Sequence, residues 1–524
     1  MKRISVYITS LVLGMALLAS CHKSLDKNPP NTLSSDAVYS TEAGYMEVLA
    51  KVYGSMALTG NQGPAGSGDV AGIDEGTSDF LRLFWKAQEL STDEAVVAWN
   101  DPGIQDFHNM NWSSSNPMLK GLYYRCTYII TLCNEFIRES ADDKVSARGF
   151  SGTTATNIKQ MRAEARFVRA FANWVLMDLY ANPGFTTEND AIGKFNPVRK
   201  TRSELFAYVE SELKAIDADL PAAKTAAYGR VDKAAAWALL ARTYLNAKVY
   251  TGTDKYTDAI TYSKKVIDAG YSLLSNYTWL MLADNNVNNP EAIWTLNYDG
   301  IKTKNYGGTT FLVNASVGGD MDKTVSGLGA WGGVRATKNL PLLFPDVNGT
   351  ADKRAQFVTG SQNLEINNIA DFKDGLAVVK FRNKTRTGAF GQDPDKTFSD
   401  IDFPIFRLAE MYLIYAEAVK RGGTGGSEAQ ALTYLNNLRT RAQASAIGTY
   451  TVDFVLDERG RELYWEGFRR TDLVRYDRFV EATYLWPWKG GAKNGAGVDA
   501  YRKIYPIPDS EIAANPNLTQ NTGY

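Results

Sequence analysis

Apolar side chains recur at steps of three and four along much of the chain, the spacing that places them on one side of an α-helix. The clearest stripe is Met161, Ala165, Val168, Ala172, Val175 and Leu179, with arginines standing between its members. We therefore expect a helix here whose one face is buried and whose other face is wet.

The same pattern predicts seven further helices. In chain order they cover residues 42–56, 119–139, 204–220, 231–250, 256–269, 407–420 and 428–441. Short connectors favour antiparallel pairs, and the alanine-rich stretch 234–241 allows the close helix approach of a tetratricopeptide-like pair. The predicted fold class is mainly α, with about four such pairs forming a superhelical scaffold.

Two regions interrupt this periodicity. Residues 59–112 are rich in Gly, Asp and Trp, and residues 271–402 are rich in Gly, Asn, Thr and aromatic residues. Both are predicted to be loop-rich insertions with short strands. Because insertions of this length are usually functional or disordered, and aromatic content argues against disorder, we expect the binding site there.

The beginning of the chain has the features of an export signal. A basic start precedes an apolar run from Ile4 to Leu18, too short to cross a bilayer comfortably, and then Leu-Ala-Ser-Cys. We predict a signal peptide at 1–20, lipidation of Cys21, and a tether at 21–31. The remainder, 32–524, is predicted to be one domain held on a membrane by its lipid.

Charge narrows the choice of ligand. The chain has 57 Lys and Arg against 58 Asp and Glu, and neither sign forms a long block. A chain with balanced charge lacks the strong positive electrostatic field of a nucleic-acid-binding protein. We therefore expect no nucleic-acid partner and favour neutral ligands. His108 is the single histidine beyond the tether, which disfavours His-rich metal sites and Ser-His-Asp catalysis.

Neutral sugars are commonly held by aromatic rings beneath their C–H faces and by planar polar groups along their hydroxyl edges. The two insertions contain both kinds of group: Arg82, Trp85, Trp99, Asn100, Asp101 and Trp112 in the first, and Tyr306 and Trp331 in the second, each of these two followed by Gly-Gly. Glycine beside an aromatic residue removes neighbouring side chains and leaves the ring open. The alternative for each ring is that it fills the core.

At these residues the sequence resembles the SusD/RagB family, and most closely its starch binder, almost end to end after the lipidation motif. The matching stretches are 73–76, 89–94, 161–167, 229–235, 305–308, 406–410, 461–475 and 505–508. The resemblance implies a helical scaffold with four tetratricopeptide-like pairs, outside the cell on the outer membrane. It also implies capture of α-glucan oligosaccharides and their delivery to a SusC-like TonB-dependent transporter.

The resemblance also implies a set of site residues. Trp99, Tyr306 and Trp331 match the family's aromatic arc, and Arg82 matches its hydroxyl-binding arginine. The sequence after Trp99 is one residue shorter than that of the starch binder. Asn100 is therefore assigned the amide contact, with Pro102 as the alternative, and Asp101 completes the predicted set.

No cofactor is predicted. A structural calcium occurs in the starch binder that the chain resembles, and Asp284 and Glu291 lie in oxygen-rich sequence. Plain turns, which Asn and Asp favour, are the preferred interpretation of that sequence.

Three alternatives to starch capture stay open. The ligand could be another oligosaccharide, or a peptide or protein in a tetratricopeptide-like groove. Asp93, Glu94 and Asp101 could form the carboxylate pair of a glycoside hydrolase, although bracing of a loop is favoured for Asp93 and Glu94, and we predict no enzyme activity. The charged segment 456–479 is predicted to be a structural helix with ion pairs between its own residues.

Overall fold

The computed structural model describes residues 34–193 and 195–524. The predicted signal peptide, the lipidated Cys21 and the tether lie outside this part of the chain. Over the described residues the fold is mainly helical with a few short strands, which confirms the predicted fold class. No helix in the described ranges is both long enough and apolar enough to span a membrane.

All eight predicted helices are present. They are α3 Glu42–Ala57, α6 Pro117–Glu139, α8 Gly152–Tyr180, α9 Arg202–Ala215, α10 Lys233–Leu245, α12 Tyr256–Asp268, α14 Leu408–Lys420 and α15 Glu428–Arg441. One predicted helix divides at Asn246, which ends α10 and precedes the short helix α11 (Ala247–Thr251). Residues 216–220 lie beyond the end of α9, where helix was also predicted.

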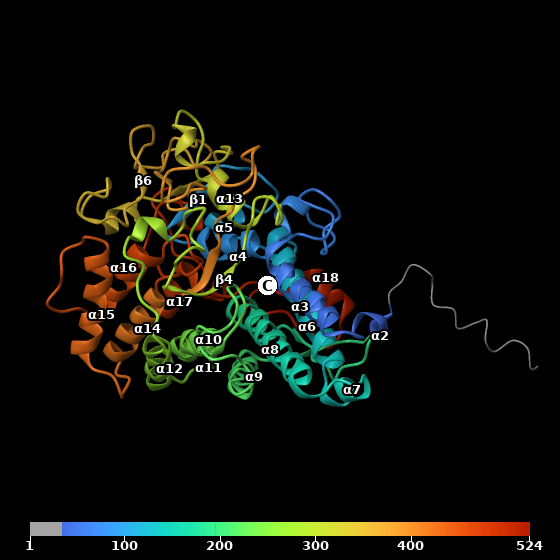
Figure 1. Cartoon of the computed structure of the whole chain (residues 1–524). Coiled ribbons are helices and arrows are strands. Elements are labelled where there is room, and N and C mark those ends of the chain that lie inside the picture. Colours follow the sequence, from blue (N-terminus) through green and yellow to red (C-terminus); the bar gives the residue numbers. More distant parts are fainter. Residues whose placement is uncertain (1–33, 194) are drawn as a thin grey trace, which may run out of the picture.

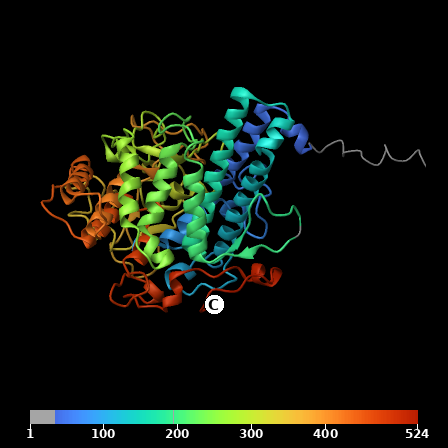
Figure 2. The ribbon, with the colours of Figure 1, turned by 90° about the horizontal axis from the view of Figure 1, so that it is seen from below.

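The helices stand side by side in a curved row, with α15 at one end and the α6–α8 pair towards the other (Figure 2). Within the row α10 packs on α12, α12 on α14, and α14 on α15, whereas α8 packs on both α6 and α9. Side-chain caps fix several starts: the Asp232 carboxylate accepts hydrogen bonds from the backbone N–H groups of Ala234 and Ala235 at the start of α10. This row is the scaffold on which the insertions rest (Figure 1).

The remaining helices are short. They are α2 Ser35–Val38, α4 Phe80–Glu89, α5 Asp106–Asn109, α7 Asp142–Ala147, α13 Gly308–Ala315, α16 Val452–Leu463, α17 Arg469–Arg475 and α18 Asp509–Ala514. Single 3-10 turns occur at Glu75–Thr77, Tyr277–Trp279, Lys323–Val325, Pro341–Leu343, Lys489–Gly491 and Ala500–Lys503.

The strands form antiparallel pairs. These are β1 Ala95–Val97 with β5 Val334–Ala336, β2 Gly184–Phe185 with β3 Val198–Arg199, β4 Ala292–Leu296 with β8 Phe403–Arg407, and β6 Phe357–Val358 with β7 Ala377–Val378. The pair β1–β5 joins the two insertions. The pair β4–β8 joins the second insertion to the start of α14.

Helix α4 lies inside a segment that was predicted to be loop. All ten of its residues are buried, including charged Arg82, Lys86 and Glu89. The helical pattern is nevertheless present in the sequence: Phe80, Phe84 and Ala87 recur at steps of four and three, and so do Arg82, Lys86 and Glu89. The pattern was missed, and it gives no sign that the polar side is buried as well.

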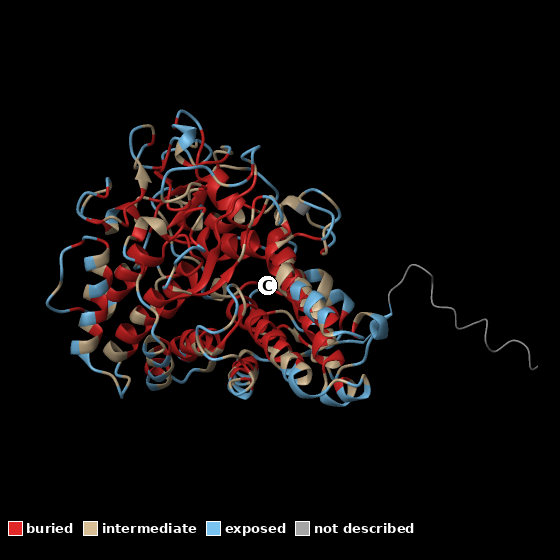
Figure 3. Ribbon diagram, in the orientation of Figure 1, coloured by how far each residue is buried: buried red, intermediate tan, exposed pale blue. Residues whose placement is uncertain are grey.

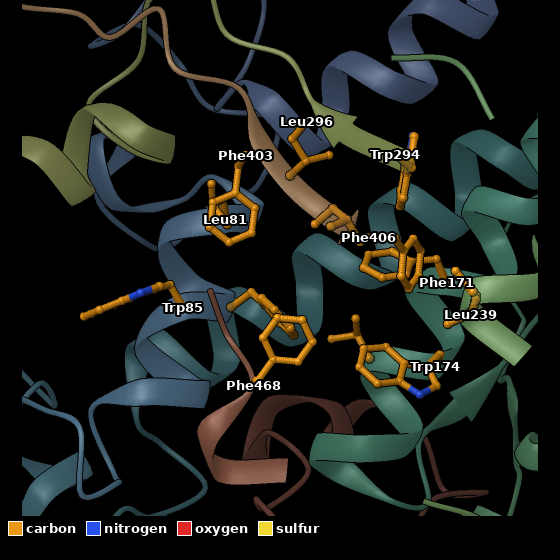
Figure 4. Packing of buried hydrophobic residues seen from close by; sticks show 14 of the residues in the cluster. Leu81, Trp85, Phe171, Trp174, Leu239, Trp294, Leu296, Phe403, Phe406 and Phe468 are labelled. Atoms are coloured by element: carbon orange, nitrogen blue, oxygen red, sulfur yellow. The ribbon is translucent and has the colours of Figure 1, made fainter. Parts of the chain in front are cut away.

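The aromatic core lies where α4, α8 and the β4–β8 pair meet, between the helical row and the insertions. Trp294 and Phe406 from the strands pack against Phe171 of α8, while Trp85 of α4 lies on the other side of the cluster (Figure 4). Buried residues fill the centre of the molecule and exposed ones follow the outer loops (Figure 3).

The prediction of one self-paired helix over 456–479 is wrong. A turn separates α16 from α17, and two of its residues have positive φ, Trp465 at 67° and Gly467 at 81°. Within the segment Arg459 pairs with Asp472 and Arg461 with Glu458, as predicted, and Arg475 also pairs with Asp472. Most of its charged side chains are buried and reach partners elsewhere in the chain.

Glu462 of α16 is the centre of this buried ionic network. Its carboxylate accepts hydrogen bonds from Arg407 at the end of β8 (2.7 Å), from Arg354 (3.3 Å), and from Arg441 of α15. Arg407 also donates to Glu291 (2.8 Å) and Glu466 (2.7 Å). Burial alone would raise the pKa of Glu462, but the surrounding guanidinium groups hold that pKa well below its usual range.

Removing the charge of Glu462 should therefore destabilise the whole fold. In Glu462→Gln the three guanidinium groups remain buried with less compensation, and we expect a loss of about 3–5 kcal/mol in the free energy of unfolding, measured in urea. The matched control is Asp268→Asn, which breaks an exposed pair with Lys264 and should cost less than about 0.5 kcal/mol. Equal costs for the two variants would contradict a central role for the network.

Candidate functional site

Trp99 and Trp331 are brought together by the β1–β5 pair. Trp99 follows β1, Trp331 precedes β5, and the Ala98 N–H extends the pairing by donating to the Gly333 carbonyl at 2.8 Å. The two indole centroids are 6.4 Å apart and their planes are inclined by 46°.

Tyr306 joins these rings from the preceding loop. Its ring centroid is 6.4 Å from that of Trp331, with an interplanar angle of 55°. All three rings are partly exposed. The structure thus gathers the three aromatic residues that the sequence singled out into one row at the surface.

Gly333 makes room for the first ring of this row. A Cβ atom at Gly333 would lie 2.3 Å from a carbon of the Trp99 indole, closer than any real contact. The second glycine after Trp331 therefore makes room for Trp99. The sequence Trp-Gly-Gly predicted an open aromatic ring, but it could not show that the ring accommodated by Gly333 is that of Trp99.

Gly307 and Gly308 have a different role from the one predicted. The N–H of Gly308 donates to the Asp79 carboxylate at 3.0 Å, and a Cβ atom at Gly307 would lie 1.6 Å from the other oxygen of that carboxylate. Asp79 also caps α4 by accepting from the N–H groups of Leu81 and Arg82. One carboxylate thus holds both the start of α4 and the turn after Tyr306, a link that sequence analysis missed.

Arg82 lies behind the row of rings. Its guanidinium carbon is 5.8 Å from the ring centroids of both Trp99 and Trp331, and 4.7 Å from that of Phe311, which packs beneath Trp99. Phe311 comes from α13 and was not predicted as a site residue. The cation over three ring faces binds the aromatic cluster together.

Hydrogen bonds fix the Arg82 guanidinium. Its Nη1 donates to the carbonyl groups of Gly76 (2.7 Å) and Tyr306 (3.0 Å), while the buried Nε has no hydrogen-bond partner among the described residues. Burial lowers the pKa of Arg82 to about 10, so the side chain stays cationic at neutral pH. Arg82 thus tethers the Tyr306 loop to α4.

Asn100 and Asp101 are exposed directly after Trp99. In the part of the chain that the structure describes, neither side chain has a hydrogen-bond partner, so both are free to meet a ligand. Pro102, the alternative to Asn100, is also exposed.

Trp85 and Trp112 do not belong to the surface row. Both are fully buried, and their indole N–H groups donate within the protein, Trp85 to the Trp465 carbonyl and Trp112 to the Tyr524 hydroxyl. They are core residues, which was the stated alternative for each ring.

The carboxylates considered for hydrolysis are also engaged inside the protein. Both oxygens of Asp93 accept from Arg469 at 2.6 Å, and Tyr484 donates to one of them. Glu94 is buried beside the same arginine. Asp93 and Glu94 therefore cannot flank a sugar bond at the rings, and of the three carboxylates considered only Asp101 is exposed beside them.

The acidic residues considered as calcium ligands also have partners within the protein. Glu291 is buried and paired with Arg407 and Arg441, and Asp284 accepts from the backbone N–H of Arg386. Across residues 34–193 and 195–524 no group of three or more His, Cys, Asp or Glu side chains is arranged to hold a metal ion.

Two buried carboxyl groups stand between α4 and the turn before α17. Glu89 and Glu94 lie close enough to interact electrostatically, and Glu89 accepts from the N–H groups of Gly467 (2.7 Å) and Phe468 (3.2 Å). Burial, and then the charge of Glu94, hold the pKa of Glu89 well above its usual range, and burial raises the pKa of Glu94 to about 7. The pair therefore keeps a proton at neutral pH, just before the strand that leads to Trp99.

This proton makes stability depend on pH. Carboxyl groups with raised folded-state pKa values stabilise the fold in acid, and that contribution is lost as the pH rises from about 4.5 through about 7. Glu89→Gln keeps a donor towards Glu94 without a titrating proton. We compare the free energy of unfolding of this variant with that of the wild type, measured in urea at both pH values. Between pH 5 and pH 8 we expect the difference to shift by about 1–3 kcal/mol in favour of the variant. A difference that does not change with pH would contradict proton sharing.

The fold and the partly exposed rings together define one type of architecture, a helical scaffold that presents a row of aromatic rings on its insertions. Comparison with known proteins agrees with this class. Residues 353–524 match the protein-family model described as SusD family, and residues 86–245 match the one described as starch-binding associating with outer membrane.

The chain is 35% identical to the starch-binding protein SusD of Bacteroides thetaiotaomicron, over 97% of this chain and 96% of that protein. It therefore belongs to the SusD family, whose members are glycan-binding proteins associated with the outer membrane.

Solved structures show the same fold. Surface glycan-binding protein A from Bacteroides uniformis superposes with a TM-score of 0.71 at 22% identity, covering 92% of this chain and 99% of that one. A laminarin-binding SusD-like protein superposes with a TM-score of 0.65 at 21% identity, with the same coverage.

Proposed function

We propose that this protein captures starch-type α-glucan oligosaccharides at the cell surface and passes them to a SusC-like TonB-dependent transporter. The observation that carries the proposal is the row of Trp99, Trp331 and Tyr306, whose neighbouring ring centroids are each 6.4 Å apart. The starch-binding function of the 35% identical relative supports the same ligand.

The shape of the row favours a coiled sugar chain. Successive rings are inclined by 46° and 55°, so their faces do not lie in one plane. An α-1,4-linked chain is itself curved and could place successive sugar faces on the rings, whereas a flat β-1,4 chain would meet one or two of them.

Polar groups beside the rings would hold the hydroxyl edge. Asn100 and Asp101 offer an exposed amide and carboxylate, each able to make paired hydrogen bonds to neighbouring hydroxyl groups. Of the Arg82 guanidinium, Nη2 is the nitrogen left for a ligand, because Nη1 is engaged by two carbonyl groups and Nε is buried. No step of this capture needs a bond to be broken, in keeping with a binding protein.

The location follows from the sequence. A signal peptide at 1–20 and lipid on Cys21 would anchor the domain to the outer membrane, facing outward, through the tether at 21–31. The family-model name supports association with that membrane.

Titration calorimetry of the full-length protein against four glucans tests the ligand. We expect maltoheptaose and cyclic α-glucans to bind at least tenfold more tightly than cellohexaose or laminarihexaose, a difference of about 1.4 kcal/mol or more. Equal or tighter binding of either β-glucan would refute the starch assignment.

Truncating one ring should weaken maltoheptaose binding without unfolding the protein. For Trp99→Ala and Trp331→Ala we expect at least about a tenfold weaker Kd, because each removes a stacking face, and a melting temperature within a few degrees of the wild type. Tyr501, far from the row in sequence, is unsuitable as a control because it is only partly exposed and packs on Tyr524. Phe195→Ala is the better match, since that side chain is 39% exposed and lies outside the row.

Gly333→Ala tests the geometry without removing a ring. The added methyl group must displace the Trp99 indole, so we expect maltoheptaose binding to weaken about as much as in Trp99→Ala. Gly360→Ala adds a methyl group where nothing lies within 4 Å and should leave the affinity unchanged. Wild-type affinity in Gly333→Ala would show that the position of Trp99 is not required.

A further inference from the structure

A second hollow lies apart from the row of aromatic rings. It has a volume of about 480 Å³, within the range of roughly 300–1,000 Å³ typical of small-molecule sites. Its walls come from segments 283–287, 297–303, 385–392 and 400–402, with Tyr228 contributed by the loop before α10. None of Trp99, Tyr306, Trp331 and Arg82 lines it, so it is a separate cavity.

Tyr228 gives this cavity an exposed aromatic face. The side chain is 47% exposed, and it lies beside Asp402 and Thr295. An aromatic ring with an open face can stack on the C–H face of a sugar. Phe390 is also in the wall, but the ammonium group of Lys396 lies 3.8 Å from its centroid and already covers it.

Unused polar groups face the same space. Asn297 lines the cavity, and among the described residues its amide nitrogen has no hydrogen-bond partner, while its oxygen accepts from the Thr295 hydroxyl at 2.6 Å. Asp299 uses one carboxylate oxygen to accept from the N–H groups of Ile301 and Lys302, which leaves the other oxygen for a ligand. A free amide donor beside a free carboxylate acceptor suits a pair of neighbouring hydroxyl groups.

The charge of the walls decides between ligand classes. Four aspartates and no Lys or Arg line the cavity within the described chain, which disfavours anions. The carboxylates are largely satisfied by the protein itself: Asp400 accepts from Gly300 and Gln392, and Asp402 accepts from the Tyr298 N–H. The four carboxylates therefore do not form a cation site, and a neutral polyhydroxy ligand fits best.

Burial supports this conclusion at one of the four carboxylates. It raises the pKa of Asp402 to about 7, with a further contribution from Asp400 and Asp299. Near neutral pH this carboxyl is about half protonated, so the cavity carries less negative charge than its composition indicates.

We infer that this cavity binds one neutral pyranose unit, with the Tyr228 ring under its C–H face and the Asn297 amide and Asp299 carboxylate along its hydroxyl edge. The two sites are structurally joined, because segment 299–306 lines the cavity at one end and carries Tyr306 at the other. The Tyr306 ring also packs on Phe398, 5.4 Å away, in the segment that continues to Asp400. The inference stands independently of the ligand of the aromatic row.

Saturation-transfer NMR on the full-length protein tests the inference, in a detergent whose head group is not a sugar. The background is Trp99→Ala/Trp331→Ala, which disables the row, and the probes are glucose, galactose, maltose and cellobiose. We expect saturation transfer to at least one of these sugars. Adding Asn297→Ala or Tyr228→Ala should reduce that transfer at least fivefold, whereas adding Asn189→Ala, an exposed asparagine outside the cavity, should not.

Each outcome decides the matter. Absence of transfer from all four sugars overturns the inference, as does transfer that survives both Asn297→Ala and Tyr228→Ala. If Tyr228→Ala lowers the melting temperature by more than a few degrees, Asn297→Ala and Asp299→Ala serve in its place. Calcium chloride provides a further arm, since a calcium-induced rise in melting temperature that Asp299→Ala abolishes would assign the cavity to a cation instead.

The outcome for the cavity is separable from that for the aromatic row. Asn297→Ala with an intact row should retain maltoheptaose affinity within about twofold in calorimetry. Loss of maltoheptaose binding in the wild type would refute starch capture and leave the cavity test unaffected.

Discussion

The interaction on which the structure depends is the burial of several arginines against a matched set of carboxylates around Glu462. Arg354 and Arg407 lie in or beside the second insertion, Arg441 lies on α15, and all three meet the same carboxylate of α16. Charges removed from water are tolerated only when their partners are in place. The buried ion pairs therefore fix the positions of these elements relative to one another. The network thereby holds the insertion against the helical row and fixes the position of the strand pair β4–β8.

The positions of the three aromatic rings depend on the scaffold that this network holds in place. Trp99 and Trp331 are set by the pairing of β1 with β5, and Tyr306 is held by the contacts of Asp79 and Arg82 with its loop. None of the three rings lies within a regular helix or strand. Their geometry is instead secured by buried polar groups that touch the backbone next to them, which is how a rigid surface can be built from loops.

Sequence patterns recovered the scaffold and the rings but not the links between them. Eight amphipathic helices were predicted from one buried stripe each, whereas the short stripe of α4 was missed and gives no sign that its polar side is buried as well. The prediction for 456–479 failed because charges at helical spacing indicate local pairing on a wet surface, and here most of them are buried and paired with distant residues. Asp79 and Phe311 could not be assigned because their roles exist only once residues far apart in the chain are adjacent. The arc itself was available from sequence only through family resemblance, since an exposed tryptophan and a core tryptophan such as Trp85 look alike in composition.

The pairing of β1 with β5 also bears on how the protein matures. The two strands are far apart in sequence, with Ala95 opposite Ala336, and pairing over such a distance requires a long loop to close. Trp99 and Trp331 become neighbours only when this pair forms. A chain that has folded its helices but has not closed the pair therefore lacks the row of rings, so an assay of the assembled row would also report on long-range closure of the fold.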